Sequence, residues 1–371
     1  MEKIIYILFS FLLLFVSCKK KTNETLNCEN DNSIDVINKR NFNMGFSTWS
    51  FGPDLSDKEE TYNFITENAD IYSEQIDYHI PWNSLINNTA FPSEFTDDIN
   101  YRLSKKISNC KLILSVSLLN TSRDNLLEDY DGTTPNYTTL NDTVIENAYY
   151  KYLTYLISQF QPDYLITAME VNELKTHSET KWQEYKLLMQ KIRTRLKNNY
   201  PDLEFSESIT LHNWFNPDVS NQTDFINDIT NYINQNLDFL AISYYPFFKG
   251  QHSKADFQKA FDFIYSQTGK PVAFVETNNI AEDLIIKNLN VNIKSNVCEQ
   301  KDYLETLLLN AYNHNYKFVI WWAYRDYDKL WETFPPEVKD ITKIWKDTGL
   351  INEKGEKRPS YTIWKKVFDK N

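Results

Sequence analysis

Eight short apolar or β-branched runs alternate with longer helical patterns from residue 44 to the end of the chain, and this alternation most limits the available folds. Segments such as FLAISYY and FVIWW are apolar almost throughout, which is typical of parallel strands covered on both faces. Eight strand-then-helix units predict a parallel sheet that closes into a single (β/α)8 TIM barrel. The predicted strands are residues 44–49, 71–76, 111–118, 164–171, 204–210, 239–244, 272–275 and 318–322.

The intervening helices support the same fold. Thr143 and Glu146 have the spacing of a capping box, and they precede an apolar stripe at helical spacing that runs from Ile145 to Phe160. The alternative is an open, doubly wound sheet. No glycine-rich GxGxxG turn follows an early strand, so the sequence favours the barrel.

The first 18 residues have the layout of an export signal, with one lysine, an apolar run over residues 4–16, then Ser17 and Cys18. The run is shorter than the roughly 20 apolar residues that span a bilayer. A small residue before a cysteine resembles the bacterial lipobox, whose cysteine is acylated after cleavage, although Phe15 stands where that pattern prefers an aliphatic residue. We therefore expect an exported protein of the bacterial cell envelope, anchored to a membrane by a lipid on Cys18.

This signal implies three segments: a signal peptide over residues 1–17, a lipid-anchored flexible tether over residues 18–41, and a barrel over residues 42–371. Cleavage would leave 371 − 17 = 354 residues, which suits one large barrel. The stretch KKKTNETLNCENDNS is polar and unpatterned, as a tether requires.

Composition excludes several classes of function. A formal net charge of -12 disfavours a nucleic-acid partner, because phosphate binding needs a basic surface. Cys28, Cys110 and Cys298 are odd in number and widely spaced, so we expect free cysteines, with neither a disulfide framework nor a zinc site. The five histidines form no HxH or HExxH motif, and we expect no catalytic metal, no cofactor and a monomer.

Two glutamates carry the expected chemistry. Segment ITAMEVNEL places Glu173 at the carboxyl end of the fourth strand, and KPVAFVETNN places Glu276 at that of the seventh. Such residues face one another across the mouth of a barrel, as glycoside hydrolysis needs: one carboxyl group protonates the leaving oxygen while the other attacks the anomeric carbon. Glu170 and Glu207 are also acidic and lie within predicted strands, where the interpretation for Glu170 is a hydrogen-bonded structural carboxyl group.

The segments VNEL and PVAFVET resemble the retaining glycoside hydrolases of the clan A barrel superfamily. DFLAISYYPFF and the tail GLINEKGEKRPSYTIWKKV are particularly similar to family 53 endo-β-1,4-galactanases, so the resemblance covers roughly residues 44–367. It implies that Glu173 is the acid/base, that Glu276 is the nucleophile and that Asn172 binds the sugar 2-hydroxyl. Trp322 would form the floor of the innermost sugar site.

The sequence departs from the clan where an arginine usually follows the second strand. This chain has SEQIDYHIPW there, and His79 or Tyr78 is expected to take the arginine's place. Tyr244 or Tyr245 is expected to donate a hydrogen bond to Glu276. Further expected sugar contacts, at or just after strand ends, are Trp49, Trp82, His212 and Asn213.

Three functions remain open at this stage. The first is a retaining glycoside hydrolase that acts on a β-linked polysaccharide or oligosaccharide through a two-glutamate double displacement. The second is a surface lipoprotein that binds glycan without cleaving it, which the missing arginine suggests. The third is a transglycosylase with the same catalytic residues.

Overall fold

The computed structural model describes Cys28 and residues 33–371. The predicted signal peptide, Cys18 and most of the predicted tether lie outside these residues. None of the described helices is long and apolar enough to cross a membrane.

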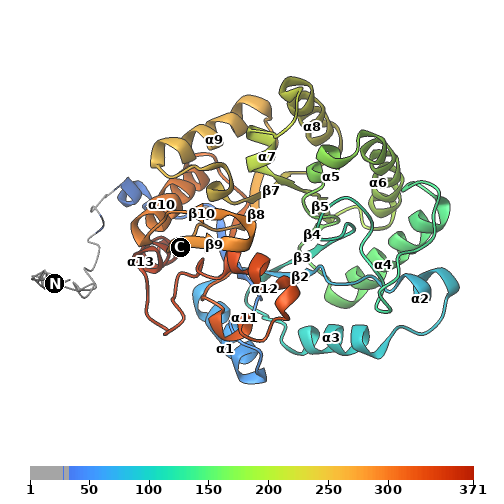
Figure 1. The fold of residues 1–371 in the computed structure, drawn as a ribbon, viewed down its shortest axis with the longest axis horizontal. Coiled ribbons are helices and arrows are strands. Elements are labelled where there is room, and N and C mark those ends of the chain that lie inside the picture. The colour runs from blue at the N-terminus through green and yellow to red at the C-terminus, as the bar shows by residue number, and fades with distance from the viewer. Residues whose placement is uncertain (1–27, 29–32) are drawn as a thin grey trace, which may run out of the picture.

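The main sheet has nine parallel strands that curl into a ring, in the order β5-β4-β3-β2-β1-β11-β8-β7-β6 (Figure 1). First and last predicted strands pair directly, because Asn43 lies opposite Phe318. This arrangement confirms the single (β/α)8 barrel. The strands are β1 Asn43–Ser47, β2 Ile71–Ile76, β3 Lys111–Val116, β4 Tyr164–Ile166, β5 Glu204–Ser206, β6 Ser208–Thr210, β7 Leu240–Tyr244, β8 Val272–Thr277 and β11 Phe318–Trp321.

Helices surround the sheet on its outside (Figure 1). The long ones are α1 Leu55–Asn68, α3 Ser93–Ser104, α4 Thr143–Phe160, α6 Glu179–Asn199, α8 Gln222–Asn236, α9 Lys254–Gln267, α10 Val297–Asn313 and α13 Pro359–Phe368. Short elements at the loops are α2 Trp82–Asn87, α5 Asn172–His177, α7 Leu211–Phe215, α11 Asp328–Trp331, α12 Pro336–Thr342, and the 3-10 turns η1 Ser33–Val36, η2 Pro246–Lys249, η3 Lys287–Leu289 and η4 Lys343–Trp345.

Helix α4 shows why these segments are helical. Its apolar stripe from Ile145 to Phe160 is buried against the sheet, as the spacing predicts. The cap differs from the prediction by one residue. Asp142, not Thr143, is the N-cap, and its carboxylate accepts a hydrogen bond from the backbone N–H of Val144.

Two apolar layers hold the barrel together. The larger lies between the sheet and the outer helices. The smaller fills the inside of the ring with side chains such as Ile71, Ile113, Phe239 and Ile320. The ring is therefore a packed core below its mouth.

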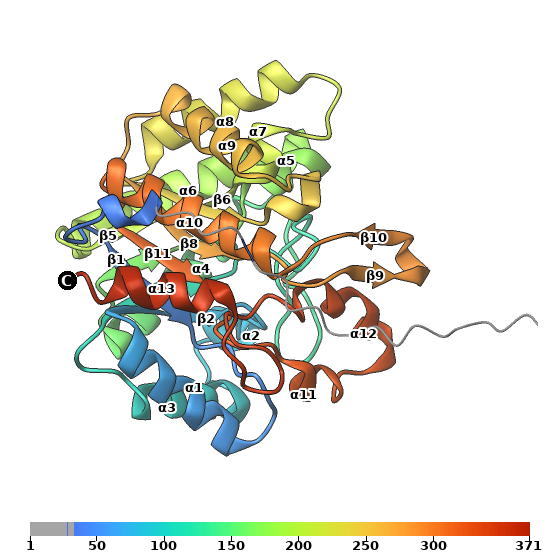
Figure 2. The ribbon, with the colours of Figure 1, turned by 90° about the vertical axis from the view of Figure 1, so that its left-hand side faces the viewer.

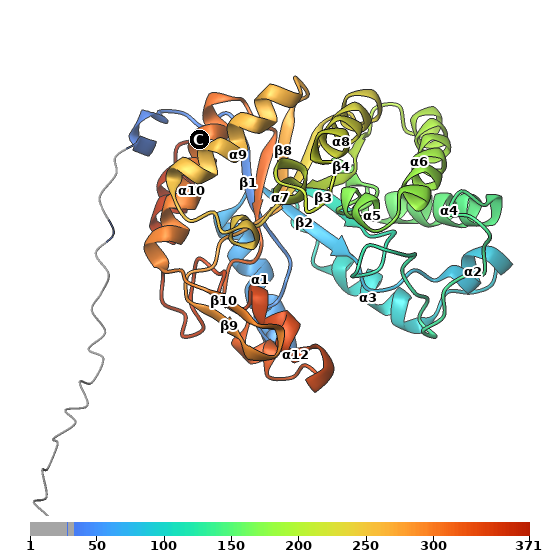
Figure 3. The ribbon, with the colours of Figure 1, turned by 45° about the horizontal axis from the view of Figure 1, so that its top comes forward.

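The packed structure begins before residue 42, where we expected the barrel to start. Ile34 and Ile37 are fully buried, and Arg40 forms an ion pair of 2.6 Å with Asp70. Arg40 also binds the last residues of the chain, so the start and end of the folded part lie side by side (Figure 3). The apolar residues at positions 34 and 37 were the sequence feature that indicated this earlier start.

The expectation of free cysteines is wrong for two of them. Cys28 and Cys298 form a disulfide across a sequence separation of 270 residues, and only Cys110 is free within the described chain. The bond joins the N-terminal segment to the start of α10. Sequence spacing could not reveal it, because the fold alone brings two such distant cysteines together.

Several loops project from the carboxyl end of the barrel. A hairpin of β9 Leu284–Ile286 and β10 Val291–Ile293 follows β8, and it lies beside α12 (Figure 2). Together with α11 these elements extend to one side of the ring, above the strand ends. The mouth of the barrel is therefore enclosed by walls.

Candidate active site

A cavity of about 400 Å³ opens at the carboxyl ends of the strands. This is the end where barrel enzymes place their chemistry. Its lining comes from almost every strand end around the ring and includes Trp49, Gln75, Glu170, Glu173, Thr210, Tyr245, Glu276 and Trp322.

Glu276 is held from two sides. Gln75, at the end of β2, donates a hydrogen bond of 2.5 Å from Nε2 to one carboxylate oxygen. The hydroxyl of Tyr245, just after β7, donates to the other oxygen. The fixed carboxylate projects from β8 into the cavity.

Two expectations about the residues that hold Glu276 need correction. The place that we assigned to His79 or Tyr78 is taken by Gln75, while the His79 ring nitrogen Nδ1 lies 3.3 Å from the backbone oxygen of Glu128. Tyr244 does not reach Glu276. Its hydroxyl is buried and donates to Gln251 at 2.6 Å.

Glu170 lies at the mouth rather than within a strand. Strand β4 ends at Ile166, and at Glu170 the backbone adopts the left-handed conformation, with φ of 55°. Its backbone N–H donates to the Ser208 hydroxyl at 2.7 Å, and the N–H of Val171 donates to the carbonyl of Ser208. The turn is thus bonded to the strand segment β6.

The Glu170 side chain is anchored at both oxygens. Arg123, in the loop after β3, donates to Oε2 from Nη2 at 2.9 Å, and Ser243 donates to Oε1 at 2.7 Å. Arg123 also has a left-handed backbone, with φ of 56°. Two non-glycine residues in this conformation that contact each other in a cavity are typical of a functional site.

The strand register shows which glutamate lies nearer to Glu276. Thr210, Ser243 and Glu276 occupy one row across β6, β7 and β8. Glu170 binds Ser243, the direct neighbour of Glu276, whereas Glu173 binds Thr210, one strand further away. Because neighbouring strands lie about 4.8 Å apart, Ser243, which anchors Glu170, lies one strand spacing nearer to Glu276 than Thr210, which anchors Glu173.

Glu173 lines the same cavity from the start of α5. Asn213 donates to both of its oxygens at 2.8 Å, and the Thr210 hydroxyl also donates to it. Burial raises the pKa of Glu173. Asn172 is fully buried and its amide exchanges hydrogen bonds with Thr210, so it fastens α5 to β6 and does not reach the cavity.

The electrostatics couple Glu170 and Glu276. Burial, followed by the charge of Glu170 and then that of Asp77, raises the pKa of Glu276. Burial acts in the same direction on Glu170, but the charge of Arg123 and the bond from Ser243 outweigh it and lower the pKa of Glu170. Two carboxyl groups that interact in this way titrate as a pair, and the second proton leaves only at raised pH.

Aromatic rings form another wall. Trp49 and Trp322 lie with ring centroids 5.2 Å apart and both line the cavity, as expected for surfaces that contact sugar rings. His212 also lines it, and burial lowers its pKa to about 4, so the ring is neutral at pH 7. Trp82 does not belong to the site, because it is buried in the core and donates to the Leu127 carbonyl at 2.7 Å.

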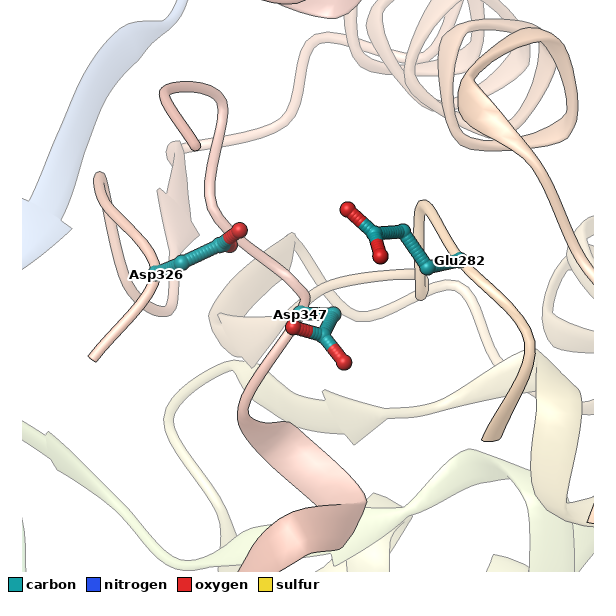
Figure 4. A group of neighbouring side chains, drawn as sticks. All are labelled: Glu282, Asp326 and Asp347. Atoms are coloured by element: carbon teal, nitrogen blue, oxygen red, sulfur yellow. The ribbon is translucent and has the colours of Figure 1, made fainter. Parts of the chain in front are cut away.

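A cluster of acids lies outside this cavity. Glu282, Asp326 and Asp347 offer oxygens within 4.8 Å of one another, and Figure 4 shows Asp326 and Glu282 directed toward each other from two loops. Arg358 bonds both of these residues, at 2.7 Å and 3.0 Å, and Lys346 pairs with Asp347 at 2.6 Å. The cluster is therefore bound by basic side chains of the protein itself.

The comparisons with known proteins concern the fold and part of the sequence. The family model of Glycosyl hydrolase family 53 matches residues 160–324, which include Glu170, Glu173 and Glu276. No curated protein matches the sequence.

Among solved structures, GH5_18 from Bifidobacterium longum subsp. longum has a TM-score of 0.64 at 14% identity, covering 88% of this chain and 79% of that one. The GH53 catalytic domain from Ignisphaera aggregans has a TM-score of 0.54 at 14% identity, covering 90% and 92%. Xylanase 10B from Thermotoga maritima has a TM-score of 0.58 at 14% identity, covering 89% and 95%.

At such low identity these structures establish the shared barrel, and the family match adds the sequence evidence. Together with a cavity that gathers the carboxyl groups of Glu170, Glu173 and Glu276 at the mouth of the barrel, they support a glycoside hydrolase with a (β/α)8 barrel, whose sequence matches the family 53 model over residues 160–324.

Proposed function

We propose that the protein hydrolyses β-linked polysaccharides or oligosaccharides with retention of configuration, and that Glu276 is the nucleophile. The clan A barrel supports retention. The acid/base is proposed to be Glu170 rather than Glu173. The observation that carries this assignment is the row Thr210, Ser243, Glu276, in which Glu170 binds the direct neighbour of Glu276.

The first step breaks the glycosidic bond. A carboxylate oxygen of Glu276 attacks the anomeric carbon, and the leaving oxygen takes a proton from Glu170. Tyr245 and Gln75 aim the attacking group through their hydrogen bonds. Retaining enzymes hold the two carboxyl groups about 5 to 5.5 Å apart, which is consistent with a Glu170 carboxyl group bound at Ser243, the position of the row next to Glu276.

The second step releases the sugar. Water attacks the anomeric carbon and gives its proton to Glu170 while the bond to Glu276 breaks. Once Glu276 is esterified its negative charge is gone, so Glu170 no longer faces a like charge and accepts the role of base. Arg123 favours the ionised form of Glu170 that this step needs.

The experiment uses three single variants, Glu276→Gln, Glu170→Gln and Glu173→Gln. Activity is first measured on β-1,4-linked galactan, mannan, xylan and glucan, and then on aryl glycosides of the sugar that wild type cleaves. We expect Glu276→Gln to abolish turnover of every substrate. Glu170→Gln should lose activity on glycans but react with aryl glycosides, whose leaving group needs no proton.

Azide identifies the acid/base. Without a general base, azide replaces water in the second step, so Glu170→Gln should give a β-glycosyl azide and recover rate. Glu173→Gln should show neither effect. If azide rescues Glu173→Gln and leaves Glu170→Gln unchanged, Glu173 is the acid/base.

The β-linkage has independent support. A GH5_18 structure similar in fold holds Manβ1-4GlcNAc, and another neighbour is an exo-β-1,4-mannosidase from an Opitutaceae bacterium. Both are clearly different in sequence, at 14% and 9% identity. A β-1,4-linked substrate panel is therefore the first to test.

We also propose that the protein is exported and anchored in a bacterial cell envelope through a lipid on Cys18. The apolar run over residues 4–16 followed by a cysteine supports this, and so does the Cys28–Cys298 disulfide, since disulfides persist in oxidising compartments. Metabolic labelling with a fatty acid should mark wild type but not Cys18→Ser. Equal labelling of both would contradict the anchor.

A further inference from the structure

The reaction cavity is continuous with two further spaces. One cavity of about 330 Å³, which we call the side cavity, contains Trp49, Gln75 and Asp77, all of which also line the reaction cavity. A third cavity, also about 330 Å³, includes Gln75 and Asp77 as well. The three spaces meet at the end of β2.

The walls of the side cavity are fixed by their own contacts. Tyr62, from α1, donates to Glu74 at 2.8 Å. Arg102, from α3, binds Glu74 at 2.7 Å and Asp98 at 2.8 Å. Because these polar groups are already paired, the shape of the cavity is set before a ligand arrives.

Aromatic surface is available in the same space. Trp49 and Tyr101 line the side cavity, and Trp49 extends into the reaction cavity. Lys58 lies over the Tyr101 ring at 5.5 Å. A wall of rings that continues from one cavity into the next suits a chain of sugar units, whose C–H faces stack on aromatic side chains.

Asp77 differs from these paired groups. It follows β2 directly, is exposed, and forms no ion pair with another residue of the described chain. It stands where the three cavities meet. An exposed carboxylate without a partner accepts hydrogen bonds and repels other anions.

We propose that the side cavity binds a second sugar unit and that Asp77 accepts hydrogen bonds from its hydroxyl groups, which makes the enzyme specific for uncharged chains. This inference rests on the proposed glycoside hydrolase function. A sugar carboxylate at the junction would face the charge of Asp77, and behind it the single negative charge that Glu170 and Glu276 share. Chains carrying uronic acid at this position should therefore bind more weakly than uncharged chains.

The first test measures the benefit of a second sugar. Aryl glycosides of the mono- and disaccharide of the cleaved sugar are compared in wild type, Tyr101→Ala and Tyr150→Ala. Tyr150 lies on α4 at a distance from the site and serves as the matched aromatic control. We expect wild type and the control to prefer the disaccharide by about tenfold in kcat/KM or more, and Tyr101→Ala to lose most of this ratio.

The second test measures charge discrimination without requiring turnover. Titration calorimetry records binding of β-1,4-linked galacto-, manno-, xylo- and cello-tetraose, and of a xylo-oligosaccharide carrying glucuronic acid, to wild type and Asp77→Asn. Wild type should prefer the neutral chain of its substrate by about tenfold or more. In Asp77→Asn this preference should shrink to within about twofold, with an unchanged melting temperature.

The outcomes separate this inference from the proposed function. If wild type hydrolyses glycans but Tyr101→Ala keeps the full disaccharide preference, or Asp77→Asn keeps the full charge preference, the second subsite is refuted and the hydrolase stands. If no substrate is cleaved, the proposed function fails, and the calorimetric comparison still decides the role of Asp77. A wild type that binds the uronic acid chain as tightly as the neutral chain overturns the inference.

Discussion

Removal of the Cys28–Cys298 disulfide should destabilise the protein without disturbing its folded state. Residues 33–41 would stay on the barrel through the buried Ile34 and Ile37 and through the ion pair of Arg40 with Asp70. The loss therefore falls on the unfolded chain, which gains the freedom that the crosslink had removed. We choose Cys28→Ser combined with Cys298→Ser, so that neither partner of the bond is left as an unpaired thiol.

The magnitude follows from the separation of 270 residues between the two cysteines. A loop of that length gives a loss of about 19 cal/mol/K in unfolded-chain entropy, or ~5.6 kcal/mol at 25 °C, and measured effects reach ~5 kcal/mol. Unfolding entropy is roughly 2.1 cal/mol/K per residue, or ~0.7 kcal/mol/K over residues 33–371. A loss of ~5 kcal/mol therefore lowers Tm by ~7 °C.

The assay is thermal unfolding followed by circular dichroism under non-reducing conditions. Cys110→Ser is the matched control, because Cys110 is the free cysteine of the described chain, and its Tm should stay close to that of wild type. Mass spectrometry after thiol alkylation verifies the bond in wild type. If the bond is present and the double variant melts within about 2 °C of wild type, the entropic reasoning is refuted.

Three other predictions concern the site and the core. Tyr245→Phe removes a hydrogen-bond donor from the carboxylate of Glu276 and should lower kcat/KM by roughly 10- to 150-fold. The hydroxyl of Tyr244 binds Gln251 instead, so Tyr244→Phe should stay near wild type, and equal losses in the two variants would contradict the geometry. Burial and the charge of Glu170 raise the pKa of Glu276, and the active pair carries one proton. We therefore expect kcat/KM to stay constant through neutral pH and to fall only well above the ordinary glutamate pKa, where the pair loses this proton. A fall of kcat/KM near pH 5 would argue against this. Arg193→Met leaves the fully buried Glu207 without its ion-pair partner and should cost about 3 to 5 kcal/mol in a denaturant titration, while an unchanged midpoint would show that this ion pair does not contribute to stability.

The barrel was predictable because its signal is repeated eight times. Strand β2 has the predicted bounds, 71–76, and apolar runs placed the other strands within a few residues. The fourth strand shows the limit. Ala168 and Met169 are buried, as a strand would bury them, but the chain has already turned and reaches Glu170 in a left-handed conformation. Burial alone does not distinguish a strand from a buried turn.

That limit explains why the sequence reasoning placed Glu170 inside the barrel. Extending the strand to residue 171 put Glu173 at its end and Glu170 inside the barrel, whereas the turn brings Glu170 to the mouth. Gln75 was accessible to sequence reasoning, since alternation along β2 puts it on the same face as Ile71, which lies inside the barrel. The contact of Arg123 with Glu170 could not be predicted from the sequence, because the loop after β3 has no periodic pattern that would place its side chains.

The turn that carries Glu170 also helps to close the barrel. The hydrogen-bonded ladder runs from β5 round to β6, two pieces of a single strand, so at this seam Ser208 is fastened to the backbone of Ala168 and Val171. Glu170, the proposed proton donor, thus belongs to the turn that closes the ring. Under the proposed mechanism, local opening of this turn would stop turnover before the barrel unfolds, so loss of activity would be the earliest sign that the ring has loosened.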